Sequence, residues 1–205
     1  MYTSKKHLFL LFLTAILAVN KSFGQTNVKI DSNRVRKSFV LQLGGGFGSY
    51  TAVVHIKPPA LSGSIRRYSA VGTIRLMWYP SYRLRFGFET GYTDFYSYKV
   101  KNGNTTGSLH LSAVPLLFVF SMQVVKRVNI YAGIGAYSEA THLNYDGTLV
   151  SRALVLGSNI ALSYTWQLSD RLGIMAEAEW MNAYDTRDAS LNLQTKLAWR
   201  FLQWR

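Results

Sequence analysis

Eight segments of this 205-residue chain alternate apolar and polar residues with a period of two. In the third segment Leu84, Phe86 and Phe88 share one face, whereas Arg85 and Glu89 share the other. A period of two places successive side chains on opposite faces of a β-strand. The segments cover residues 39–50, 67–79, 84–93, 108–122, 128–137, 153–167, 172–181 and 191–201. The chain is therefore expected to be all-β.

The connections between these segments alternate in length. Tight turns follow the second, fourth and sixth segments at residues 80–82, 125–127 and 169–171. Longer polar connections follow the other segments at residues 51–65, 99–107, 138–150 and 182–190. Short periplasmic turns and longer outer loops are typical of outer-membrane barrels. The pattern predicts an eight-stranded antiparallel up-and-down transmembrane β-barrel with both chain ends on the periplasmic side.

The balance of charge indicates which face of the barrel meets lipid. Charged residues make up 16% of the chain and hydrophobic residues 48%, whereas soluble domains carry about 25% charged residues. The polar faces of the strands hold mainly Gly, Ser, Thr and Asn, which is too little charge for the exterior of a soluble protein. We expect the apolar faces to point outward into lipid. The alternative is a soluble lipocalin-like barrel with those faces inward.

Aromatic side chains are expected to form a belt at each membrane interface, where one end of the ring is apolar and the other wet. The predicted periplasmic belt consists of Trp78, Trp166 and Trp199. The predicted outer belt contains Tyr68, Tyr92, Tyr96 and Trp180, with Tyr50 and Tyr184 at the same rim.

The first residues of the chain have the composition of a cleavable secretory signal. Lys5 and Lys6 precede an apolar run over 8–19, and the small residues Ser22 and Gly24 suit a cleavage site. An uncleaved anchor is the alternative, but the run is shorter than a membrane-spanning helix requires. The expected division of the chain is a signal peptide at 1–24, a short periplasmic segment at 25–37 and an outer-membrane barrel domain at 38–205.

Four short stretches resemble the PorT-like outer-membrane β-barrel proteins of the Bacteroidetes. They are FGQ at 23–25, the glycine-rich LGGGFG at 43–48, VPLL at 114–117 and YAGIG at 131–135. The resemblance extends from Phe39 to the C-terminus, and the architecture is also similar to the small OmpA/OmpX-type barrels. It implies an outer-membrane barrel without naming a substrate. The terminal WRF at 199–201 is similar to an aromatic-ended signal for the barrel-assembly machinery.

Charged side chains on the polar faces are expected to pair inside the barrel. Arg75 and Glu89 would lie diagonally near one another, and Glu177 would lie opposite Lys196, with Glu179 nearby. The interior of an eight-stranded barrel is just wide enough for side chains, and an unpaired charge there costs several kcal/mol. An ion-paired plug is the expected arrangement, and a narrow polar conduit is the alternative.

His110 and Ser112 are the strongest candidates for chemistry, since His-x-Ser is similar to an element of an outer-membrane lipid A deacylase. Both side chains are expected to face the lumen, with no acid placed to orient the imidazole. We therefore expect no catalytic site. His55 and His142 lie in outer connections with no clustered carboxylate, and the chain has no Cys, so no metal site or cofactor is expected.

Two features of the chain invite a nucleotide-binding or nucleic-acid-binding interpretation that the pattern does not favour. The glycines at 44, 46 and 48 precede no helix and no Lys-Ser/Thr pair, and are expected to make room for bulky neighbours. Lys and Arg number 23 against 10 acidic residues, a net charge of +13, but they are dispersed along the chain. Pro115 lies within a strand and is expected to occupy a bulge.

These observations predict a non-enzymatic outer-membrane barrel with a structural or interaction role through its extracellular loops. The expected partners are outer-membrane lipids, lipopolysaccharide, the barrel-assembly machinery and an extracellular or envelope protein. The basic connection at 99–104 suits anionic lipopolysaccharide. A conduit for small solutes or ions, and a lipid-A-modifying enzyme, remain the alternatives.

Overall fold

The computed structural model describes residues 37–52, 63–80, 83–102, 105–144 and 147–204. The predicted signal peptide, almost all of the segment that follows it and His55 lie outside the described residues. Among the described residues, no helix has the length and apolar character needed to cross a membrane. The strands are β1 (Lys37–Tyr50), β2 (Gly63–Arg66), β3 (Tyr68–Tyr79), β4 (Leu84–Asn102), β5 (Thr105–Val125), β6 (Val128–Asn144), β7 (Thr148–Gln167), β8 (Leu172–Ala183) and β9 (Asp188–Trp204).

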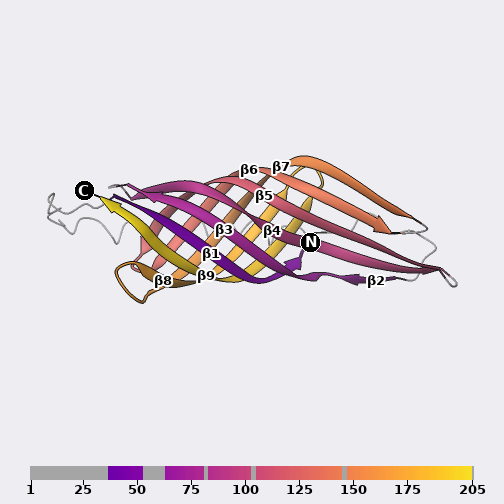
Figure 1. Ribbon diagram of the computed structural model, residues 1–205, viewed down its shortest axis with the longest axis horizontal. Helices are drawn as coiled ribbons and strands as arrows, with labels where there is room; N and C mark the ends of the chain where they lie inside the picture. Colours follow the sequence, from indigo (N-terminus) through magenta and orange to yellow (C-terminus); the bar gives the residue numbers. More distant parts are fainter. Residues whose placement is uncertain (1–36, 53–62, 81–82, 103–104, 145–146, 205) are drawn as a thin grey trace, which may run out of the picture. The chain divides into compact units, whose positions relative to one another are not determined.

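Eight of these strands form a closed antiparallel ring (Figure 1). β1 closes the ring by pairing with β3 on one side and with β9 on the other. From β3 to β9, each strand of the ring pairs with the next strand along the chain. β2 pairs with residues 97–100 of β4, just past residues 86–93, which pair with β3. β2 therefore extends β3 along the same edge of β4 and is not a ninth strand of the ring. The predicted eight-stranded up-and-down barrel is confirmed.

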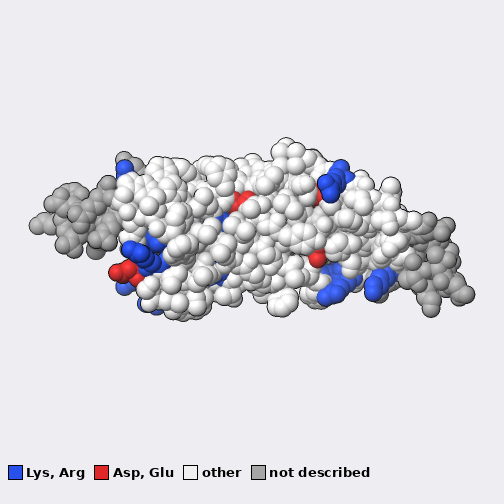
Figure 2. Space-filling view, in the orientation of Figure 1, with Lys and Arg blue, Asp and Glu red and all other residues white. Residues whose placement is uncertain are grey.

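The exterior of the barrel wall is apolar, as the alternation of the strands predicts. Phe47, Phe88 and Leu193 are 77%, 66% and 62% exposed, and all three point away from the lumen. Figure 2 shows few charged side chains over the middle of the visible face, with Lys and Arg gathered towards the ends. Closure of the ladder pairs the backbone groups around the ring without water, and together with the apolar exterior this is the condition for crossing a bilayer as strands.

The two ends of the barrel differ. The turns after β3, β5 and β7 lie at the end where Lys37 pairs with Trp204. Short turns and chain ends are typical of the periplasmic side. At the other end the strands run further than predicted, with pairing as far as Asn102–Thr105 and Asn144–Thr148. Most of the predicted loops at 99–107 and 138–150 are therefore paired strand, because each hairpin supplies its own backbone partners.

The bulge of β4 and β5 lies elsewhere than predicted. Pairing between these strands omits Pro115 and resumes at Ala113 in an unchanged register. A proline has no backbone N–H for the ladder, and here the strand tolerates that loss without a bulge. The register shifts instead between Asp94 and Tyr96.

Candidate functional site

Arg75 on β3 lies at the centre of a buried ionic network inside the barrel. Its Nη1 and Nη2 donate to the two carboxylate oxygens of Glu177 at 2.8 and 3.0 Å, and its Nε donates to Glu89 on the neighbouring strand. Nη1 also donates to Gln42 at 3.2 Å, and the guanidinium carbon lies 4.2 Å from the ring centroid of Tyr131. The guanidinium is thus held on its edges by acceptors and on one face by a ring.

Lys196 on β9 is the second cation of the network. Its Nζ lies 2.6 Å from Oε1 of Glu177, so this carboxylate meets two cations. The stem of Lys196 crosses Gly44 on β1, where a Cβ would overlap the Lys196 Cγ. The glycine therefore makes room for a long side chain to turn inward.

Glu179 is held by amide groups. Asn159 Nδ2 and Gln194 Nε2 each donate to its carboxylate at 2.6 Å. Asn159 Nδ2 also donates to Glu89 at 2.9 Å, so one amide bridges two carboxylates. Thr73 donates to Gln194 at 2.7 Å and orients its amide. Among the described residues Glu179 forms no ion pair. The network thus contains three carboxylates and two cations, and the cations pair with Glu89 and Glu177.

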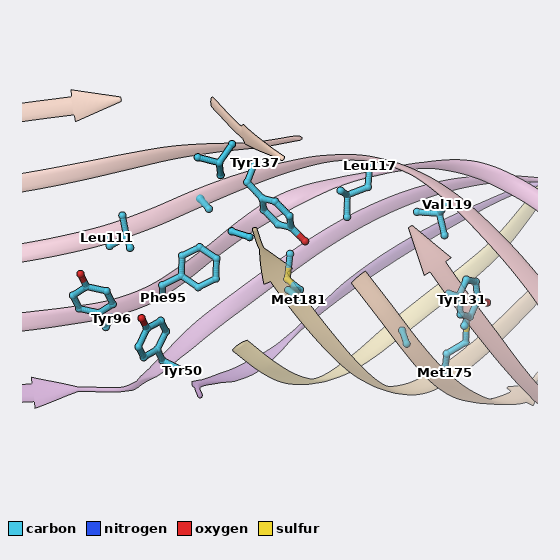
Figure 3. Close-up of a cluster of buried hydrophobic side chains, with 14 of the residues drawn as sticks. Tyr50, Phe95, Tyr96, Leu111, Leu117, Val119, Tyr131, Tyr137, Met175 and Met181 are labelled. Atoms are coloured by element: carbon cyan, nitrogen blue, oxygen red, sulfur yellow. The ribbon is translucent and has the colours of Figure 1, made fainter. Parts of the chain in front are cut away.

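Two layers of side chains fill the lumen. The charged side chains of the network are at most 3% exposed. On the side of the longer strands lies a second layer, in which the ring centroid of Tyr50 is 5.0 Å from that of Tyr96 and 6.3 Å from that of Phe95. Figure 3 shows these rings together, with Tyr137 and Met181 beside them. The barrel interior is packed at both levels, as expected for a ring of eight strands.

The five residues predicted to form interior ion pairs all lie inside the barrel, but in a different register. Arg75 is directly opposite Glu89, where a diagonal position was predicted. Lys196 is opposite Met175, so its contact with Glu177 runs diagonally and the predicted direct pairing is wrong. The difference arises because a turn of only four residues, 184–187, joins β8 to β9.

The predicted belt residues lie on the exterior with one exception. Trp166 and Trp199 are about half exposed at the end with the short turns, and Trp78 packs edge-on against Phe86 at 4.7 Å. The residues exposed towards the opposite rim are Tyr68, Tyr92, Trp180 and Tyr184.

Tyr96 is the exception, and its predicted place in the outer belt is wrong. Tyr96 is 8% exposed and belongs to the buried cluster of the lumen, next to the fully buried Phe95. The bulge between Asp94 and Tyr96 adds one residue to β4 and reverses the alternation beyond it. Tyr50 also points inward, where its hydroxyl donates to Asp188 at 2.5 Å.

The prediction that His110 and Ser112 face the lumen is wrong. β5 buries Leu111 and Ala113 in the interior cluster, so the alternating residues at 110 and 112 lie on the outer side of the wall, where Ser112 is nevertheless only 5% exposed. His110 Nε2 lies 2.9 Å from Oδ1 of Asp94, an acid on the adjacent strand that sequence reasoning did not place there. Within the described strands no hydrogen bond joins Ser112 to His110, so the nucleophile and base required for hydrolysis are not connected.

His142 pairs with His110 across β5 and β6. Among the described residues no group of three or more His, Cys, Asp or Glu side chains is arranged to hold a metal ion.

A cluster of cations that sequence reasoning did not single out surrounds the lumen at the end with the short turns. It lines a cavity of about 340 Å³. We call this site the basic mouth, and its cations are Arg85, Lys126, Arg127, Arg171 and Arg200. These residues come from four separate places along the chain, and only closure of the ring brings them together.

No family model and no curated protein matches the sequence. Solved structures that resemble the chain weakly include the following three. Neisserial surface protein A (NspA) is 14% identical over 80% of this chain and 99% of its own, with a TM-score of 0.46. Ail, the attachment invasion locus protein of Yersinia pestis, is 8% identical over 81% and 98%, with a TM-score of 0.46. The outer membrane protein OprG from Pseudomonas aeruginosa is 9% identical over 80% and 97%, with a TM-score of 0.42.

At these identities and TM-scores, the assignment of the chain rests on its own geometry. The ring of strands is closed, its exterior is apolar, and its short turns lie at the same end as the start of β1 and the end of β9. These are the features of outer-membrane barrels. The chain is an outer-membrane β-barrel, in agreement with the predicted location.

Proposed function

We propose that this protein is a non-enzymatic outer-membrane barrel that does not conduct, and that it has a structural or interaction role through its extracellular surface. The observation that carries the proposal is the packed lumen. Arg75, Lys196 and Glu179 are fully buried in mid-barrel, and Phe95 and Tyr137 are fully buried beyond them. A conduit would need a continuous polar path through both layers, so the packing favours an anchor over a pore.

The extracellular side offers a defined contact surface. β8 ends at Ala183, opposite Gly157, so residues 148–155 of β7 pair only with β6 among the described strands. Leu149 and Leu154 on this stretch are 64% and 72% exposed. An unpaired strand edge with exposed apolar side chains is a template for adding a strand from another protein. We propose that this edge receives an extended segment of an extracellular or envelope protein.

Conductance measurements test the closed lumen. The purified protein, refolded and inserted into planar lipid bilayers, is expected to give no discrete current steps in 1 M KCl. Insertion is verified in parallel by a mobility shift between unboiled and boiled samples on a gel. Reproducible open-channel currents from folded protein would contradict the proposal and favour the conduit.

The PorT-like assignment, the signal peptide at 1–24 and the periplasmic segment at 25–37 remain predictions. N-terminal sequencing of the protein recovered from outer membranes checks the signal peptide and the start of the periplasmic segment, with Gln25 expected as the first residue.

A further inference from the structure

We propose that the basic mouth binds a phosphate-type anion presented from the periplasmic side. The inference is independent of the extracellular role proposed above, because it concerns the opposite end of the barrel. Figure 2 shows Lys and Arg side chains gathered at the left, with acidic atoms beside them, where β9 ends in Figure 1.

The cations of the basic mouth have no carboxylate partners within the part of the chain that the structure describes. None of the described residues lining the cavity is Asp or Glu, and no carboxylate oxygen of residues 37–52, 63–80, 83–102, 105–144 and 147–204 lies within 4.0 Å of the five cations. Arg200 donates through Nη1 to a main-chain oxygen, that of Asp170, at 3.1 Å. In the central network, by contrast, both cations meet carboxylates. Like charges that converge in a concave site raise the local concentration of a counter-anion.

Arg85 is positioned for an anion before any ligand arrives. Its Nη1 donates to Asn129 and its Nη2 to Gln123, both at 3.0 Å, and its guanidinium carbon lies 4.2 Å from the ring centroid of Tyr79. A guanidinium has five N–H donors, so these two bonds leave three for a ligand. Its planar fork matches the spacing of phosphate oxygens. Asn129 is itself oriented by donating to Thr165 at 3.3 Å.

Arg127 is a further cation of the basic mouth. It lies in the turn between β5 and β6 with a φ of 78°, a left-handed conformation that favours glycine and that other L-residues rarely adopt. Its side chain lines the cavity.

The size of the cavity limits the ligand. A volume of about 340 Å³ lies near the lower end of the roughly 300–1,000 Å³ that is usual for ligand sites. Met175 lies on the wall of the cavity and is 1% exposed, and the buried Tyr131 and Arg75 lie further along the lumen. The ligand therefore enters and leaves from the same side. A phosphate group fits these limits, either on a free molecule or on a lipid headgroup.

Calorimetric titration with inorganic tripolyphosphate tests the site. The full mature chain is refolded in dodecyl maltoside without phosphate, and two variants with an equal loss of charge are compared with it. Arg127→Gly removes a cation of the basic mouth. Arg187→Gly removes a cation at the opposite end of the barrel, and Arg187 also has a positive φ, of 57°. Glycine suits both positions, so both variants are expected to fold.

Saturable binding to the parent protein and to Arg187→Gly, at least fivefold weaker in Arg127→Gly, is the expected result. Arg85→Gln is expected to weaken binding at least tenfold, because it removes the pre-oriented guanidinium. A parent protein that shows no saturable binding in calorimetry and no retained phosphatidylglycerol in native mass spectrometry overturns the proposal. Equal affinities for tripolyphosphate in the parent protein and in the three variants would also overturn the proposal.

The second arm distinguishes the two sources of phosphate. If the parent protein retains phosphatidylglycerol in native mass spectrometry, Arg85→Gln loses it and tripolyphosphate does not bind, the ligand is a lipid headgroup. If tripolyphosphate binds and does so equally well in the presence of phosphatidylglycerol, the ligand is a free anion. Both outcomes support a phosphate site at the basic mouth.

Discussion

Gly44 on β1 lies directly opposite Lys196 on β9, and the stem of Lys196 fills the space that a Gly44 side chain would occupy. The glycine-rich first strand therefore has a specific function in the fold. It lets one wall of the barrel stay thin, so that a lysine from the neighbouring strand can reach Glu177 in mid-lumen at 2.6 Å.

Replacing Gly44 by Val is expected to destabilise the barrel by about 1–3 kcal/mol, the usual cost of overpacking a close-packed interior. The added methyl groups displace Lys196 from its ion pair. Urea unfolding in lipid vesicles, followed by Trp fluorescence, measures the change. Gly45→Ala is the control, since a Cβ there meets nothing closer than 3.6 Å. Equal stability of Gly44→Val and the parent protein would show that the lysine is free to move aside.

Glu177 and Glu179 are two residues apart on one strand but are expected to respond differently to amidation. Glu177→Gln weakens contacts with two buried cations, and breaking a buried ion pair costs about 3–5 kcal/mol. Glu179→Gln is expected to cost less, because Glu179 accepts hydrogen bonds from Asn159 and Gln194 and forms no ion pair among the described residues. Unfolding free energies of the two variants in the same vesicles test the order. A larger loss of unfolding free energy in Glu179→Gln than in Glu177→Gln would mean that Glu179 contributes more than Glu177 to stabilising the buried cations.

The free edge of β7 can be blocked without breaking its ladder to β6. The Tyr184 backbone N–H donates to Leu156 C=O, so the backbone groups of residue 156, and by alternation those of residue 152, point towards the free side. Arg152→Pro removes one outward donor, which an edge strand tolerates. A photoreactive side chain at position 150 is expected to cross-link a partner in the parent protein and in Arg152→Ala, and not in Arg152→Pro. Undiminished cross-linking in Arg152→Pro would exclude strand addition at this edge.

The double substitution of His110 and Ser112 by Ala is expected to leave the lipid A of the host unchanged. Ser112 has no hydrogen bond to the imidazole in the described strands, so the outward-facing His110–Asp94 pair has no activated nucleophile. Mass spectrometry of lipid A from cells expressing the parent or the double variant checks this. A difference in acyl chains between the two would restore the enzyme as a candidate.

The alternation of residues identified the strands, and the alternating lengths of the connections indicated a barrel of eight strands. The low charge of the polar faces indicated that the apolar faces meet lipid. The alternation also identified Arg75, Glu89 and Lys196 as interior residues. These conclusions follow locally, because a period of two assigns each side chain to one face of its strand. An apolar face on every strand then leaves closure in lipid as the stable arrangement.

Tertiary structure decided which residues meet. One extra residue at Phe95 turned Tyr96 inward, and the four-residue turn before β9 set Lys196 diagonal to Glu177. The cations of the basic mouth come from strands and turns far apart in sequence, and their convergence has no local signature. Bulges, registers and ring closure depend on pairing between strands, so alternation within one strand carries no information about them.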